Sequence, residues 1–145
     1  MTELKIEADV SRAEDVNIYV SKRLDEICCP PQIKVQICIA ADEIFSNIAR
    51  YAYGSGTGSA EVCVEAEHYP PAAVITFTDC GTEYDPFLAE DPDITLPAQK
   101  RGEGGLGIYI VKKLMDSVSY EYRDGMNILR LRKYFEKNEN REQSH

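Results

Sequence analysis

The chain has 145 residues, 43% of them hydrophobic, and a formal net charge of −9. This length predicts a single domain that buries a core of its own without cross-links. No run of residues approaches the ~20 apolar residues of a transmembrane helix, and the first residues lack the basic and apolar regions of a signal peptide. We therefore expect a cytoplasmic protein that binds no membrane, and its acidic charge disfavours binding to nucleic acid phosphates.

Cysteine and histidine offer little catalytic or metal-binding chemistry here. The five cysteines are odd in number and include no C-x-x-C spacing, which argues against a disulfide framework and a zinc site. We expect reduced thiols, although the adjacent Cys28 and Cys29 could respond to oxidants. The two histidines, His68 and His145, lie in a predicted turn and at the chain end. A Ser–His or Cys–His pair, a His-rich metal site and a phospho-accepting histidine are therefore not expected.

The first third of the chain predicts a strand and two helices. Alternating apolar residues predict a strand over 3–8. Ser11 and Glu14 have the spacing of a capping box, which predicts a helix from there to about Cys28, before Pro30 and Pro31.

The segment from Gln32 to Tyr53 fits two patterns. Its first apolar residues alternate as in a strand, but the whole segment has spacings of three and four, as on one helix face. The length without a turn signal favours a helix, ended by the glycine-rich loop 54–59. The predicted buried face comprises Ile33, Ile37, Ala41, Ile44, Ile48 and Ala52.

Two strands are predicted next, one around 62–66 and one around 73–79, with a turn between them. The alternation of the second strand places Asp79 on the core side. Residues 82–103 contain three prolines and many acids, which is typical of a lid or a mobile loop.

The last third predicts a helix and a hairpin. The helix resumes at Gly105 with Leu106, Ile110 and Leu114 on one face. An Asp-Gly turn then joins strands at 118–123 and 126–134. The domain is expected to span 1–135, followed by a charged flexible tail at 136–145.

Three short motifs carry the polar chemistry. Glu43 and Asn47 are one helical turn apart and share a face beside the core. This glutamate could act as a general base or polarise a water or hydroxyl, and the asparagine offers a neutral oxygen to Mg²⁺. A solvated helix edge would show the same spacing.

The second motif is Asp79 with Gly81 at the end of a buried strand. An inward carboxylate needs a hydrogen-bond donor, and the exocyclic amine of adenine is one. The glycine would let the backbone approach a planar base. A strand-end aspartate that caps a turn is the alternative.

The third motif is glycine-rich, from Gly102 to Gly107, at a helix start where backbone N–H groups converge on an anion. It is neither a Walker A loop nor a Rossmann fingerprint. Lys100 and Arg101, just before it, could contact phosphate or be solvated loop charges.

In this order and spacing the motifs resemble the GHKL, or histidine kinase-like, ATPase superfamily. The resemblance runs from about Val10 to Lys133, and two stretches, 77–86 and 104–131, look like bacterial anti-sigma factor serine-protein kinases. The N box is matched by Glu43 and Asn47, the D-x-G box by Asp79 and Gly81, and the G-x-G box by Gly104, Gly105, Leu106 and Gly107.

The resemblance implies an α/β two-layer sandwich with a mixed, mostly antiparallel sheet and helices on one face. It implies ATP or ADP and Mg²⁺ as ligands, with Asn47 on the metal, Asp79 on the adenine amine, Glu43 as the catalytic base and 86–103 as the ATP lid. Where many members carry threonine near the adenine, this chain has Asn127, which we expect to replace it as a polar contact. No role is predicted for Arg50.

The function implied is a serine/threonine kinase that phosphorylates a STAS-domain anti-anti-sigma partner and regulates transcription by partner switching. A sigma factor as second partner and a homodimer are also implied. Two alternatives stay open: a nucleotide-binding interaction module without kinase turnover, and a structural domain with degenerate motifs. A sensor histidine kinase is not expected, because no acceptor helix is present.

Overall fold

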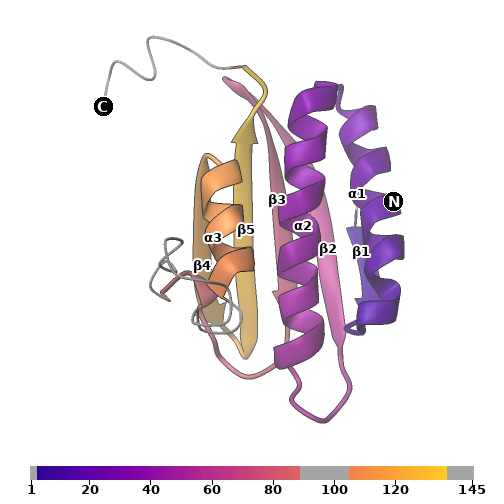
Figure 1. The fold of residues 1–145 in the computed structure, drawn as a ribbon, viewed down its shortest axis with the longest axis vertical. Coiled ribbons are helices and arrows are strands. Elements are labelled where there is room, and N and C mark those ends of the chain that lie inside the picture. Colours follow the sequence, from indigo (N-terminus) through magenta and orange to yellow (C-terminus); the bar gives the residue numbers. More distant parts are fainter. Residues whose placement is uncertain (1–2, 89–104, 137–145) are drawn as a thin grey trace.

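The structure is a computed structural model that describes residues 3–88 and 105–136. Three α-helices cover one face of a sheet, which gives two layers (Figure 1). Short 3-10 turns lie at Val10–Arg12 and Pro86–Leu88. The elements are β1 (Glu3–Glu7), α1 (Ala13–Glu26), α2 (Pro31–Tyr51), β2 (Ser59–His68), β3 (Pro71–Asp79), α3 (Gly105–Leu114), β4 (Ser117–Arg123) and β5 (Met126–Tyr134).

The strands of the described residues form one five-stranded sheet in the order β1-β2-β3-β5-β4. All four pairings among the described residues are antiparallel. The expected antiparallel character is confirmed, and the parallel pairing that a mixed sheet would include does not occur among these residues. β3 and β5 lie side by side, although the whole of α3 and β4 separates them in sequence (Figure 1). This pairing places Asn127 directly opposite Asp79.

The predicted hairpin is formed by β4 and β5. Its turn residues Asp124 and Gly125 both have positive φ, 53° and 78°. This left-handed conformation matches the twist of two antiparallel strands, and glycine adopts it without a steric cost.

The segment from Gln32 to Tyr53, which fits two patterns in the sequence, forms helix α2, as predicted from its length. Pro31 is its first residue, where the missing N–H costs no hydrogen bond. The predicted face of α2 packs on the sheet: Ile37, Ala41, Ile44 and Ile48 are buried, and Ile33 and Ala52 are partly buried.

The predicted start of the first helix was wrong. Asp9, not Ser11, supplies the cap, since its carboxylate accepts a hydrogen bond from the Ser11 N–H at 2.9 Å. A turn of 3-10 helix follows, and α1 begins at Ala13 without a side-chain cap.

The apolar face that the sequence indicates for α3 is not the face that packs most deeply on the core. Leu106 is 42% exposed, whereas Ile108, Val111 and Met115 are buried against the core. The helix is nearly all apolar, so its sequence has two stripes of helical spacing. Contact with the rest of the fold selects between them.

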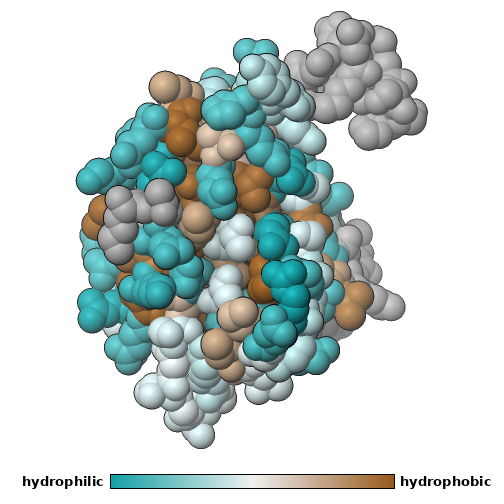
Figure 2. All heavy atoms as spheres, turned by 180° about the vertical axis from the view of Figure 1, so that it is seen from behind, coloured by the Kyte–Doolittle hydropathy of each residue, from teal (hydrophilic) through white to brown (hydrophobic). Residues whose placement is uncertain are grey.

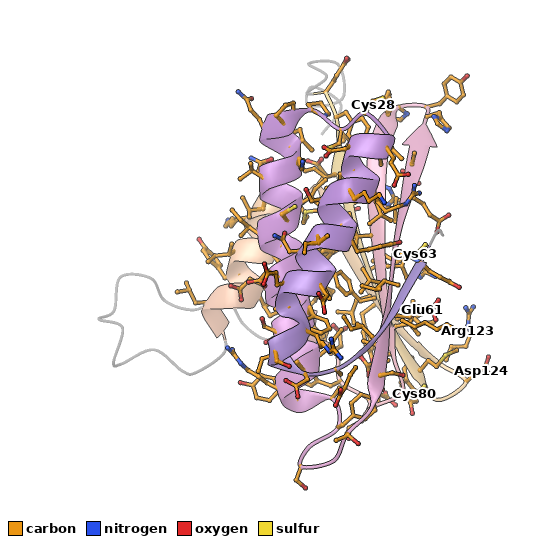
Figure 3. All side chains as sticks on the ribbon, turned by 90° about the vertical axis from the view of Figure 1, so that its right-hand side faces the viewer. Cys28, Glu61, Cys63, Cys80, Arg123 and Asp124 are labelled. Atoms are coloured by element: carbon orange, nitrogen blue, oxygen red, sulfur yellow. The ribbon has the colours of Figure 1, made fainter. Side chains whose placement is uncertain are left out.

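The sheet face without helices is largely polar. Thr76, Thr78 and Arg130 alternate on it with inward core residues, and Figure 2 shows hydrophilic side chains with scattered apolar ones there. Glu61 and Cys63 lie on this side, away from the helices (Figure 3). None of the helices in 3–88 and 105–136 is long and apolar enough to cross a membrane.

Candidate functional site

A pocket of about 280 Å³ lies between α2, the end of β3, the start of β5 and the segment after β3. Its wall is mainly apolar and includes Ile44, Ile48, Pro86 and Leu129. Three predicted site residues from separate parts of the chain line it together: Asn47, Asp79 and Asn127. A mostly apolar cleft with a few polar groups is typical of a small-molecule site.

Asp79 is the last residue of β3 and is only 4% exposed. Its Oδ1 accepts hydrogen bonds from the Gly81 N–H at 2.8 Å and from the Asn127 amide at 3.0 Å. Among the residues that the structure describes, no donor contacts Oδ2. One carboxylate oxygen is therefore held in place by the protein, and the other is left for a donor in the pocket.

Asn127, 3% exposed, is held by protein groups on every side. Its Nδ2 donates to Asp79 Oδ1 and to the carbonyls of Gly81 and Thr82, at 3.0, 3.3 and 3.0 Å. Its Oδ1 accepts from the Tyr84 N–H at 3.1 Å and from the Tyr120 hydroxyl. The side chain thus joins β5 to Asp79 and to the backbone that leaves β3.

The sequence did not indicate Tyr84 and Tyr120 as site residues. Burial raises the pKa of Tyr120, so its phenol stays protonated and can donate to Asn127. Tyr120 follows a strand alternation that is typical of any half-buried strand. Only the pairing of β4 with β5, which sets Tyr120 opposite Leu129 and diagonally from Asn127, reveals the contact.

Gly81 is required by a protein contact. A Cβ at this position would overlap the carbonyl of Ala52 at the end of α2. The same carbonyl accepts a hydrogen bond from the Thr82 N–H at 2.9 Å. The chain after Asp79 therefore presses against the end of α2, and the close approach of Gly81 to a base stays a prediction.

Glu43 and Asn47 lie on α2 as predicted, but they face different spaces. Asn47 lines the pocket. Glu43 lines a separate groove between α1 and α2. Its carboxylate packs against Gly107 in the first turn of α3, where an added Cβ would overlap Oε2. Glu43 therefore lies where α2 meets the start of α3.

Several predicted residues are not placed against the pocket. Lys100, Arg101 and Gly104 lie outside the described residues, as does most of the predicted lid. Gly105 opens α3 as predicted, and Leu106 projects outward. Their part in the site stays a prediction.

The donors fit magnesium better than a transition metal. In residues 3–88 and 105–136 no group of three or more His, Cys, Asp or Glu side chains could hold a metal. Asn47 brings a single neutral oxygen into the pocket, and Mg²⁺ takes few protein ligands when phosphates supply the others.

Comparison with known proteins gives a family. The histidine kinase-like ATPase domain matches residues 6–133. The chain is 27% identical over 100 residues to the serine/threonine-protein kinase BtrW of Bordetella bronchiseptica, a match that covers 69% of this chain and 70% of BtrW. It is 29% identical over 108 residues to the serine-protein kinase RsbW of Bacillus cereus, covering 68% of this chain but only 62% of that protein.

Two solved structures share the fold. The RsbU and RsbW domains of Rv1364c from Mycobacterium tuberculosis superpose with a TM-score of 0.61 at 13% identity, over 95% of this chain and 34% of that one. The SiaB–SiaC complex from Pseudomonas aeruginosa gives a TM-score of 0.58 at 17% identity, over 92% of this chain and 89% of that chain.

Proposed function

Because the chain belongs to the histidine kinase-like ATPase domain family, we propose that it is a protein serine/threonine kinase of the anti-sigma factor type. It transfers a phosphoryl group from ATP to a serine of a STAS-domain anti-anti-sigma partner, and the exchange of partners regulates transcription. The observation that carries this proposal is the meeting of Asn47, Asp79 and Asn127 in one pocket, with Glu43 one helical turn away beside α3.

The pocket supports binding of an adenine nucleotide. The free Oδ2 of Asp79 accepts a hydrogen bond from the exocyclic amine of adenine, whose ring lies between the apolar walls. Asn47 would hold Mg²⁺, and that ion would neutralise charge on the triphosphate. The N–H groups at the start of α3 would face the phosphates, and Lys100 and Arg101 stay predicted phosphate contacts.

Glu43 is the proposed catalytic residue. Its carboxylate accepts the proton of the serine hydroxyl while the serine oxygen bonds to the γ-phosphorus. The bond from that phosphorus to the β–γ bridging oxygen breaks, and its electrons leave with ADP. The contact of the Glu43 carboxylate with Gly107, in the first turn of α3, supports this role.

A nucleotide-gated binding module without turnover is the second candidate. One observation favours it: Glu43 lines a groove distinct from the pocket that holds Asn47. In that case ATP and ADP would bias which partner is held. Binding of a sigma factor and formation of a homodimer stay predictions in both cases.

The test uses the purified chain, ATP with Mg²⁺, and the STAS-domain protein encoded nearest to its gene. Mass spectrometry should find phosphoserine with the wild type and at least ~100-fold less with Glu43→Gln, since a general base contributes about 10²–10⁴. Asp79→Asn should weaken ATP binding by about 1–3 kcal/mol. ATP binding without phosphoserine would favour the second candidate. Unchanged phosphoserine with Glu43→Gln would contradict the catalytic role of Glu43, and unchanged ATP affinity with Asp79→Asn would contradict the adenine contact.

A further inference from the structure

A second hollow lies on the outer surface of the helix layer, in the groove between α1 and α2, which are side by side in Figure 1. We call it the α1–α2 groove, and its volume is about 560 Å³. One stripe of each helix forms its walls, and Glu43 stands in it. Its lining includes Glu14 from α1 and Lys34, Val35, Ile39, Asp42 and Glu43 from α2.

The groove carries an unbalanced negative charge. Its lysine, Lys34, is already paired with Asp25 at 2.8 Å. Glu14, Asp42 and Glu43 have no ion-pair partner within residues 3–88 and 105–136. Three carboxylates in one groove attract a cationic group and repel an acidic one.

The same groove has an exposed apolar strip. Val35 is 59% exposed and Ile39 is 45% exposed, and they follow each other by one helical turn on α2. These exposed aliphatic side chains lie beside the three carboxylates of the groove. The combination fits an occupant that has both apolar and basic side chains.

The groove also leads to the proposed catalytic base. Glu43 forms part of its wall and touches Gly107, so it stands between the groove and the start of α3. The groove gives a hydroxyl a route to Glu43 from outside the nucleotide pocket. We propose that the α1–α2 groove binds the acceptor segment of the protein substrate, and that this segment has its serine or threonine beside basic and aliphatic residues. The inference rests on the proposed kinase function.

The charge of the groove is tested with Asp42→Lys and with Glu7→Lys as control. Both change the net charge equally, but Glu7 is exposed on β1, outside the groove. With the STAS-domain protein as substrate below its KM, Asp42→Lys should lower kcat/KM about tenfold, and less so at high salt. Glu7→Lys should stay within about twofold. A Lys→Glu change beside the acceptor serine should restore activity with Asp42→Lys.

The apolar strip is tested with Val35→Asn against Ile18→Asn, which leave the charge of the groove unchanged. Val35 and Ile18 are 59% and 58% exposed on neighbouring helices, but only Val35 lines the groove. We expect Val35→Asn to lower kcat/KM at least about tenfold and Ile18→Asn to change it within about twofold. ATP affinity should be unchanged in all four variants.

The two proposals fail separately. If the wild type forms phosphoserine and the groove variants match their controls, the groove assignment is wrong and the kinase function stands. If the wild type binds ATP and forms no phosphoserine, the kinase function is wrong, and the acceptor role of the groove falls with it.

Discussion

At the scale of single residues, the amide of Asn127 decides how the pocket is built. It contacts Asp79, the carbonyls of Gly81 and Thr82, and the groups donated by Tyr84 and Tyr120. Only a side chain with both donors and an acceptor can make all of these contacts, and a threonine hydroxyl cannot. The Asp79 carboxylate and the chain that leaves β3 are therefore fixed by the same residue.

Asn127→Asp should be costly because it removes the donors and sets a second carboxyl beside Asp79. We expect the free energy of unfolding to fall by about 2–3 kcal/mol at pH 7.5, as measured by urea denaturation. A carboxyl introduced beside another carboxylate is harder to ionise in the folded than in the unfolded state, which raises the folded pKa of the introduced group. The deficit should therefore shrink as the pH falls through that raised pKa.

The control is Asn17→Asp, since Asn17 is exposed on α1. It should change the free energy of unfolding by less than about 0.5 kcal/mol, both at pH 7.5 and at the lower pH. Equal effects of the two substitutions, or a loss of stability in Asn127→Asp that grows as the pH falls, would contradict the proposed role of the Asn127 amide.

At the scale of secondary structure elements, α2 and its buried face could be predicted, and the neighbours of its polar residues could not. Its length and apolar spacing indicate a helix, and the i, i+4 spacing puts Glu43 and Asn47 on one side. Which neighbour each contacts depends on where α1 and α3 pack, and no local pattern encodes that. Gly81 shows the same limit, since its need for glycine comes from Ala52 in a different element.

The structure predicts which side of α3 stabilises the fold. Ile108→Ala should lower the free energy of unfolding by about 2–4 kcal/mol, because Ile108 is 5% exposed and leaves a cavity. Leu106→Ala should cost less than about 1 kcal/mol, since Leu106 is 42% exposed. Urea denaturation of the two variants measures both values. A larger loss of unfolding free energy in Leu106→Ala than in Ile108→Ala would mean that the Leu106 face of α3 packs on the core.

At the scale of the whole molecule, the site depends on strand order. Asp79 and Asn127 are predicted separately by strand parity and by resemblance, but their contact exists only because β5 inserts between β3 and β4. Short-range patterns predict strands and hairpins well. They do not predict which distant strands pair, so only the structure reveals the hydrogen bonds of Asn127.

The overall arrangement also sorts the cysteines, none of which forms a disulfide. Cys28 and Cys80 are exposed at opposite ends of the molecule, and Cys63 lies on the open sheet face (Figure 3). Burial raises the pKa of Cys29 to about 11. Burial and the nearby Glu65 carboxylate raise the pKa of Cys63 to about 11 as well. Since the thiolate is the nucleophile, these two thiols should react slowly.

Iodoacetamide at pH 8, followed by peptide mass spectrometry, measures this. A thiol with a pKa near 11 is about 0.1% thiolate at pH 8, against roughly 10% for one at 9.0, so Cys63 should react about a hundredfold more slowly than an ordinary exposed thiol. Its rate should rise about tenfold per pH unit up to pH 10. Glu65→Gln should speed it at pH 8, because removing the carboxylate lowers the thiol pKa, whereas Cys28 at the far end should be unaffected. Rapid labelling of Cys63 in the wild type, with no response to that substitution, would mean that the sheet face around it is more open than its contacts indicate.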